Sequence, residues 1–245
     1  MNDWYREDLA YIQDVGFSNY TLKSAPGILA ILERDRIREG LIVELGCRSG
    51  LLAEVLSSKE YRVLGIDISE SLLEIARTKV PEAEFQARSL FSAEIPPCSA
   101  VISVGECFNY LFDAENNAVR LMELFQHIYN ALMPGGLFIF DIVEPGQMDS
   151  GTEQRFTEGK DWVVLVDKVE AGDILTRRII TFRKVGEFYR RSEEVHRQQL
   201  YRAAELAGEL ERIGFQVEVM GNYGEFALPK ARVALIAKKP SDSQS

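Results

Sequence analysis

The sequence has few of the residues that build disulfide scaffolds and metal centres. Among 245 residues there are three cysteines and two histidines. Cys47, Cys98 and Cys107 form no C-x-x-C pair, and His127 lies far from His196 in the sequence. A disulfide framework and a His/Cys zinc site are therefore both disfavoured. We expect a reduced protein that holds no metal.

Long hydrophobic runs and an excess of positive charge are also absent. The most apolar stretches, such as 137–143, are far shorter than the ~20 residues that cross a bilayer, and the first residues carry charges where a signal peptide needs an apolar run. The 28 basic and 38 acidic residues give a net charge of −10. This balance disfavours binding to nucleic acid or to an anionic membrane, although it allows a local basic patch. We expect a cytoplasmic protein that binds neither. The sequence leaves its oligomeric state undetermined.

Apolar residues are abundant, and their spacing indicates an α/β fold. Short apolar segments alternate with amphipathic ones, which is typical of βαβ units in a parallel sheet covered on both faces. The expected strands are 41–45, 61–67, 83–87, 100–104, 136–142, 215–221 and 231–239, and the expected helices between them are 50–58, 69–79, 115–133 and 203–213.

Two further segments are predicted as additions to this pattern. Pro26 is expected to open a helix over 27–38. The polar stretch 145–159 reads as a loop. After it, three segments alternate apolar and polar residues with period two and predict an inserted antiparallel meander; they are 162–170, 173–184 and 187–199.

Together these features predict a doubly wound, mostly parallel sheet of seven strands. The expected organisation is an N-terminal helical cap over 1–39, a main domain over 40–239 and a disordered tail over 240–245. The insertion at 145–200 is expected to form a lid over the carboxyl ends of the strands.

The residues that indicate chemistry follow the first two strands. Gly46 and Gly50 lie in the turn between the first strand and its helix, and Asp67 ends the second strand. Glycines let the backbone approach a ligand, and an acid at this place can accept both hydroxyls of a ribose. The dinucleotide fingerprint would need glycines at positions now held by Arg48 and Leu51, and no P-loop is present. We therefore expect a nucleoside-containing ligand without a pyrophosphate; the alternative is a plain tight turn beside an exposed Asp.

This pattern resembles the class I S-adenosylmethionine-dependent methyltransferases. Their first motif, E/D-x-G-x-G-x-G, is matched by Glu44, Gly46 and Gly50, with Arg48 at the middle glycine, and Asp67 matches their ribose acid. The resemblance implies a Rossmann-like fold whose last strand is antiparallel. It also implies S-adenosylmethionine as cofactor, with no metal. It assigns these residues to the cofactor site: Glu44, Gly46, Cys47, Arg48, Gly50, Asp67, Ile68, Ser89, Leu90 and Gly105.

Three of these positions carry a particular expectation. The resemblance places Ser89 and Leu90 against the adenine, where the family usually has an acid instead of Ser89. Arg48 either points to solvent or holds the methionine carboxylate. Cys47 is expected to pack against the cofactor or against the sheet.

The resemblance also implies the reaction, which is in-line attack of an acceptor on the sulfonium methyl group with release of S-adenosylhomocysteine. The protein mainly aligns the reactants, and it needs a general base only if the acceptor is protonated. Glu106 follows the fourth strand and is a candidate base. Asn109 and Tyr110 are candidate substrate contacts. The alternative for these three is an exposed loop acid beside a packed tyrosine.

A second candidate base lies in the predicted meander. If 187–199 is a strand, Glu194 and His196 share one face of it. Glu194 would then orient His196 as a base, or both would bind substrate. The alternative is a solvated strand face with a structural histidine.

The acceptor is expected to be a small molecule. Methyltransferases that act on nucleobase amines have an Asp/Asn-Pro-Pro-aromatic run after the fourth strand, where this chain has Gly105 to Phe108. Two alternatives stay open: an inactive methyltransferase-like protein that binds the cofactor, and an enzyme for protein or RNA. The sequence does not determine whether nitrogen, oxygen, sulfur or carbon is methylated.

Overall fold

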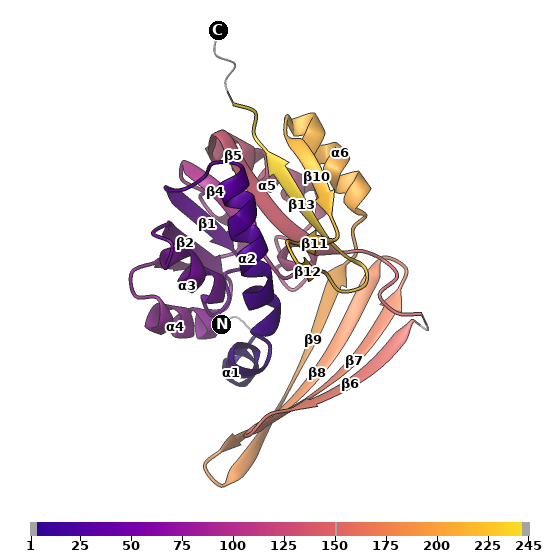
Figure 1. Ribbon diagram of the computed structural model, residues 1–245. Helices are drawn as coiled ribbons and strands as arrows, with labels where there is room; N and C mark the ends of the chain where they lie inside the picture. Colours follow the sequence, from indigo (N-terminus) through magenta and orange to yellow (C-terminus); the bar gives the residue numbers. More distant parts are fainter. Residues whose placement is uncertain (1–3, 150, 242–245) are drawn as a thin grey trace.

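The computed structural model describes residues 4–149 and 151–241 and contains two large sheets (Figure 1). The central sheet has seven strands in the order β10-β13-β5-β4-β1-β2-β3. Strands β1 to β5 pair in parallel, whereas β13 runs antiparallel to both β5 and β10. The predicted sheet and its antiparallel last strand are therefore confirmed. The strand bounds are β1 Leu41–Leu45, β2 Arg62–Asp67, β3 Glu84–Ala87, β4 Cys98–Ser103, β5 Leu132–Val143, β10 Gln216–Met220 and β13 Arg232–Lys238.

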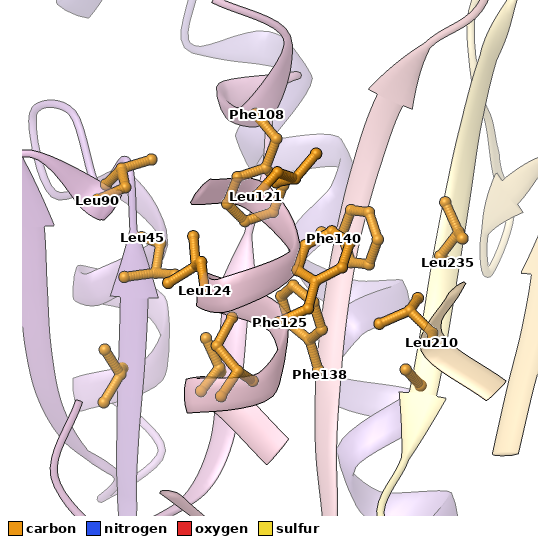
Figure 2. Close-up of a cluster of buried hydrophobic side chains, with 14 of the residues drawn as sticks. Leu45, Leu90, Phe108, Leu121, Leu124, Phe125, Phe138, Phe140, Leu210 and Leu235 are labelled. Carbon is orange, nitrogen blue, oxygen red and sulfur yellow. The ribbon is translucent and has the colours of Figure 1, made fainter. Parts of the chain in front are cut away.

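Helices cover both faces of this sheet, as its apolar strands require. One face packs Phe138 and Phe140 of β5 against Phe125 and Leu210 of the flanking helices (Figure 2). The other face buries the intervening residues of β5 against α2 and α3. The helix bounds are α1 Glu7–Gly16, α2 Asn19–Arg34, α3 Leu51–Ser57, α4 Glu70–Lys79, α5 Ala118–Ala131 and α6 Ala203–Ile213.

The prediction that Pro26 opens a helix over 27–38 is wrong. Helix α2 begins at Asn19, contains Pro26 in its interior and ends at Arg34. A proline inside a helix loses one backbone hydrogen bond. The residues before it, including Ser24 and Ala25, are buried on the same helix as Ile28. Packing against the sheet outweighs the local preference for a helix start at proline.

The second sheet is the lid. It contains β6 Thr152–Glu158, β7 Trp162–Ala171, β8 Ile174–Val185 and β9 Phe188–Gln199, paired antiparallel in sequence order. The three predicted meander strands are present. The prediction of a loop over the whole of 145–159 is wrong because its second half forms β6. This strand is an edge strand with mostly exposed polar side chains, so it lacks the apolar alternation that marks a buried strand.

The lid lies at the carboxyl ends of the parallel strands and is joined there to the rest of the chain (Figure 1). Buried residues of α1, Leu9 and Ile12, pack against Trp162, Val164 and Ile179 of the lid. The loop after β4 also bridges to β9, because the backbone N–H of Leu111 donates to the carbonyl of Arg197 at 2.8 Å. The lid therefore closes over the place where the sequence motifs lie.

Shorter elements complete the fold. Two-residue strands β11 Asn222–Tyr223 and β12 Phe226–Ala227 form a hairpin between β10 and β13. Within the described residues, no helix combines the length and the apolar character that crossing a bilayer would require. Of the tail over 240–245, the first two residues have no regular structure and 242–245 lie outside the described residues.

Candidate functional site

A cavity of about 510 Å³ lies between the central sheet and the lid. Its floor is formed by the loops that follow β1, β2 and β4. Its walls come from α1, from the inner face of β6, β7 and β8, and from the segment 229–232 that leads into β13. The motif residues and the inserted sheet thus meet around one space.

The glycine turn after β1 forms one edge of this cavity. Gly46 has a φ of +74°, and a Cβ atom there would lie 2.3 Å from Sγ of Cys107, so only glycine fits. Gly50 has a φ of +75° and does not line the cavity; its missing side chain lets α3 begin close to Ala76 of α4. The turn therefore brings bare backbone to the cavity.

Arg48 occupies the middle of this turn with a φ of +53°. Its guanidinium lies in the cavity and donates to Oε1 of Gln13 on α1. The solvent orientation is therefore wrong for this side chain. The geometry allows the second expectation, in which the guanidinium at this edge of the cavity contacts the carboxylate of a ligand.

Asp67, at the end of β2, points a buried carboxylate at the cavity. Its Oδ2 accepts the backbone N–H of Arg48 at 2.9 Å, and its Oδ1 accepts that of Ser69 at 2.9 Å. Burial raises the pKa of Asp67, and the two backbone N–H groups oppose that rise. The carboxylate keeps lone pairs for further donors, which suits a ribose diol. Ile68 and Leu90 line the cavity beside it.

Like Gly50, the predicted cofactor residues Glu44 and Cys47 do not line the cavity. Glu44 is buried beneath the turn, where its Oε2 has no hydrogen-bond partner, and burial raises its pKa to about 8. Cys47 packs against β2, with its Sγ close to Gly65. Both residues support the turn from the side of the sheet.

Ser89 does not itself line the cavity, but its partner is an unexpected acid that does. The Ser89 hydroxyl donates to Oδ2 of Asp113 at 2.6 Å and accepts the backbone N–H of Phe91 at 3.1 Å. Asp113 is buried and lines the cavity. The site thus has an acid near the expected adenine position, supplied by the loop before α5.

The loop after β4 is held by a buried carboxylate. Backbone N–H groups of Gly105 and Glu106 donate to Asp141 of β5, at 3.0 Å and 2.8 Å for the shortest contacts. The fully buried Asp141 also accepts the Tyr223 hydroxyl at 3.4 Å. This clamp fixes Gly105, which has a φ of +97°, at the cavity surface.

The Glu106 carboxylate is paired with two arginines. Its Oε1 accepts from Nη1 of Arg177 on β8 at 2.8 Å, and its Oε2 pairs with Arg232 of β13. Burial alone would raise the pKa of Glu106, but the charges of Arg232 and Arg177 outweigh it and hold the pKa below its usual range. A general base works best when its pKa is near the working pH. The geometry therefore disfavours Glu106 as a base and favours a role in positioning the arginines.

Tyr110 lines the cavity, whereas Asn109 does not. The Tyr110 hydroxyl lies 3.0 Å from that of Tyr5 and accepts from Nη1 of Arg177 at 3.3 Å. The Asn109 amide group donates to the carbonyls of Val143 and Gln199 and accepts the N–H of Val143. The Asn109 side chain therefore bonds to the backbone of Val143 and Gln199.

His196 and Glu194 lie behind the cavity wall. Nε2 of His196 is 2.8 Å from Oε2 of Glu194, and both side chains are buried outside the cavity. Glu194 accepts the backbone N–H groups of Tyr5 at 2.9 Å and Arg6 at 3.1 Å. The His196 ring packs near the ring of Tyr110. The pair holds the N-terminal segment, so that Tyr5 lines the cavity.

Several cavity residues are missed by sequence reasoning. They are Tyr5, Gln13, Asp113, Lys168, Arg177 and Arg232. For Lys168 and Arg177 a signal existed, because both interrupt the apolar face of a period-two strand. The others belong to segments whose proximity depends on the tertiary fold.

Comparisons with known proteins match the family that the sequence motifs resemble. A family described as "Methyltransferase domain" matches residues 42–136. A "putative methyltransferase" of Geobacillus sp. strain WCH70 is 27% identical over 209 residues, which is 81% of this chain and 84% of that protein.

Solved structures extend the similarity to the whole fold. An S-adenosylmethionine-dependent methyltransferase from Clostridium acetobutylicum superposes with a TM-score of 0.80 at 20% identity, covering 95% of this chain and 98% of that one. The sugar N-methyltransferase KedS8 from Streptoalloteichus sp. has a TM-score of 0.77 at 15% identity, covering 98% and 94%. The lid is therefore part of a shared architecture.

Proposed function

Because this chain belongs to the class I S-adenosylmethionine-dependent methyltransferase family, we propose that it methylates a small-molecule acceptor inside the cavity beneath the lid. The chain is an S-adenosylmethionine-dependent methyltransferase; the size of the acceptor is the proposed part. One observation carries it: the cavity of about 510 Å³ joins the motif residues to the inner face of the lid. Such a volume is typical of small-molecule sites. The structural relative KedS8 is a sugar N-methyltransferase, which is in line with a small acceptor.

The cavity residues fit the cofactor. Asp67 would hold the ribose hydroxyls, and the bare backbone at Gly46 would allow close approach of the methionine part. The Ser89 hydroxyl, with Asp113, would meet the adenine. Arg48 would hold the methionine carboxylate, because its guanidinium lies in the cavity beside that turn.

When bound, S-adenosylmethionine supplies a methyl group that is already activated on a sulfonium. The residues of this chain then need to align the acceptor and exclude water. Asp141 fixes the loop at Gly105, and the ion pair with Arg177 joins Glu106 to the lid. Helix α1 and the lid cover the cavity and keep bulk water from the reacting atoms.

Calorimetric titration of S-adenosylmethionine and S-adenosylhomocysteine tests the cofactor site. We expect Asp67→Ala to weaken both at least tenfold, or ~1.4 kcal/mol, because the ribose hydroxyls lose their acceptor. Asp167→Ala, on the outer face of the lid sheet, is the matched control and should bind like the natural chain. Failure of the natural chain to bind either ligand would overturn the proposal.

Neither predicted base is placed to take a proton from a ligand, since Glu106 is ion-paired and His196 lies outside the cavity. Methyl transfer needs a base only when the acceptor is protonated. This arrangement therefore favours an acceptor that is already deprotonated at neutral pH.

A further inference from the structure

A row of charged side chains crosses the inner face of the lid. Glu153 of β6 pairs in register with Lys168 of β7, and Lys168 pairs in register with Arg177 of β8. All three line the cavity. The Lys168 and Arg177 side chains are only 15% and 13% exposed. Directly opposed residues have Cβ atoms about 5 Å apart, so two cations lie side by side beneath the lid.

This arrangement places like charges next to each other, although each cation also has a carboxylate partner, Glu153 for Lys168 and Glu106 for Arg177. Like charges directly opposite one another destabilise a sheet. Burial lowers the pKa of Lys168, and the nearby charge of Arg177 lowers it further, although Nζ of Lys168 donates to Oε2 of Glu153 at 2.9 Å, which opposes that shift. In addition, the buried Nε of Arg177 has no hydrogen-bond partner. A perturbed cation pair inside a cleft is typical of a binding site.

The rest of the acceptor side has the same sign. Beyond the cofactor residues, the cavity is lined by five cations, Arg155, Lys168, Arg177, Lys230 and Arg232. The acids that line that side are Glu106, which pairs with Arg177 and Arg232, and Glu153, which pairs with Lys168 and Arg155, so the cations outnumber the acids. The cavity is thus locally cationic in a chain whose net charge is −10, and the sulfonium of the cofactor adds a further positive charge. A protonated amine would be repelled, whereas an anion would be attracted.

Carboxylates are ionised at neutral pH and need no general base. Building on the proposed function, we infer that the acceptor is a small carboxylic acid whose carboxylate is bound by Lys168 and Arg177 and is methylated on oxygen. A carboxylate oxygen attacks the methyl carbon, forming a carbon–oxygen bond. The carbon–sulfur bond breaks, its electron pair stays on sulfur, and no proton moves. The products are a methyl ester and S-adenosylhomocysteine.

The ester product has a chemical signature. The full chain is incubated with S-adenosylmethionine labelled in the methyl group and with a panel of mono-, di- and tricarboxylates. The matched primary amides, amino sugars and phosphate monoesters form the comparison panel. We expect label only with carboxylates, and we expect mild alkali to release it as methanol. Label that resists alkali, in a product from an amine or a phosphate, would overturn the inference.

Variants of the row test the binding role. Lys168→Gln and Arg177→Gln should each raise the KM of the carboxylate at least tenfold. They should leave the affinity for S-adenosylhomocysteine within twofold of the natural value. The controls are Arg178→Gln, on the outer face beside Arg177, and the exposed Lys184→Gln. They should change neither the KM of the carboxylate nor the affinity for S-adenosylhomocysteine.

The outcomes separate this inference from the function on which it rests. If S-adenosylhomocysteine does not bind the natural chain, the proposed function fails. If it binds, but no carboxylate is methylated and none binds the S-adenosylhomocysteine complex in calorimetry, only this inference is overturned. An unchanged KM in both lid variants would overturn it as well. Arg177→Lys keeps the positive charge and is the control for misfolding of Arg177→Gln. It should retain more affinity for the carboxylate than Arg177→Gln does.

Discussion

At the scale of single residues, Glu44 couples the glycine turn to pH. Its carboxyl group is buried, and its pKa is raised from 4.5 to about 8, first by burial and then by the charge of Asp67. Between these two values the folded protein keeps a proton that the unfolded chain releases. Stability therefore falls as pH rises through this window, by up to ~1.4 kcal/mol for each pH unit. The contribution of Glu44 to stability is fully present only when the pH is below the pKa of this carboxyl group in the unfolded chain.

Glu44→Gln removes this titration while keeping the shape of the side chain. We expect the free energy of unfolding of the variant to change less steeply between about pH 5 and about pH 8. Above that range the variant should be more stable than the natural chain. Urea unfolding at several pH values measures the slope. Glu54→Gln, exposed on α3, should keep the natural slope. Parallel curves for the natural chain and Glu44→Gln would contradict the expectation.

At the scale of elements, the N-terminal segment depends on the lid. Asp8 of α1 is buried and accepts from Nε of Arg190 on β9 at 2.6 Å. Glu194, on the same strand, accepts the backbone N–H groups just before α1. These contacts join segments from distant parts of the sequence. They explain how Tyr5 and Gln13 come to line the cavity.

Glu194→Ala removes the acceptor of two backbone N–H groups. We expect faster hydrogen exchange at Tyr5 and Arg6, and increased exchange over α1, because the segment opens locally at lower free energy. Mass-spectrometric hydrogen exchange measures it. Glu193→Ala changes the neighbouring residue, whose partners Arg178 and Arg191 lie on the outer side of the lid, and should leave exchange over α1 unchanged. Equal exchange in both variants would refute this role for Glu194.

The elements differ in how far the sequence determines them. The central strands and helices were predictable because apolar periodicity is a local property of the chain. The start of α2 was not, since packing of Ser24 and Ala25 overrides the signal of Pro26. Strand β6 was also missed, because its pairing with β7 determines it and its own side chains are mostly exposed.

The candidate site shows the same division. The motif predicted residues that do line the cavity, namely Gly46, Arg48, Asp67, Ile68, Leu90 and Gly105. Their placement follows from local strand–turn–helix geometry. Arg232 and Tyr5 could not be found this way, because they reach the cavity from opposite ends of the sequence. His196 was misplaced for a related reason: strand alternation gives the face of a side chain, and tertiary packing determines what covers that face.

At the scale of the whole molecule, the two sheets have unequal cores. The central sheet has large hydrophobic clusters on both faces, whereas the lid is joined to α1 by a small one. Both tryptophans belong to the smaller part. Trp162 lies in the lid cluster, and Trp4 stacks on Phe112 with ring centroids 5.4 Å apart. Tryptophan fluorescence therefore reports on the lid and the N-terminal segment, while circular dichroism at helical wavelengths reports mainly on the central domain.

We expect the ligand-free protein to lose tryptophan fluorescence at a lower urea concentration than it loses helical dichroism, because the lid has less apolar burial. Trp4→Phe leaves Trp162 alone to report on the lid and should give the same early transition. S-adenosylhomocysteine should raise the later midpoint through binding. Coincident transitions without ligand would mean that the two sheets unfold as one unit.

The position of β13 has a consequence for how the protein is made. A ribosome delivers the chain from its N-terminus, and folding begins in that order. Strand β13 fits between β5 and β10, and every other residue that lines the cavity precedes Arg232 in the chain. A nascent chain therefore contains Glu106 and Arg177 before it contains Arg232, the second arginine that pairs with Glu106. Completion of the central sheet and completion of the site are one event, so an unfinished translation product presents no finished cavity to the metabolites around it.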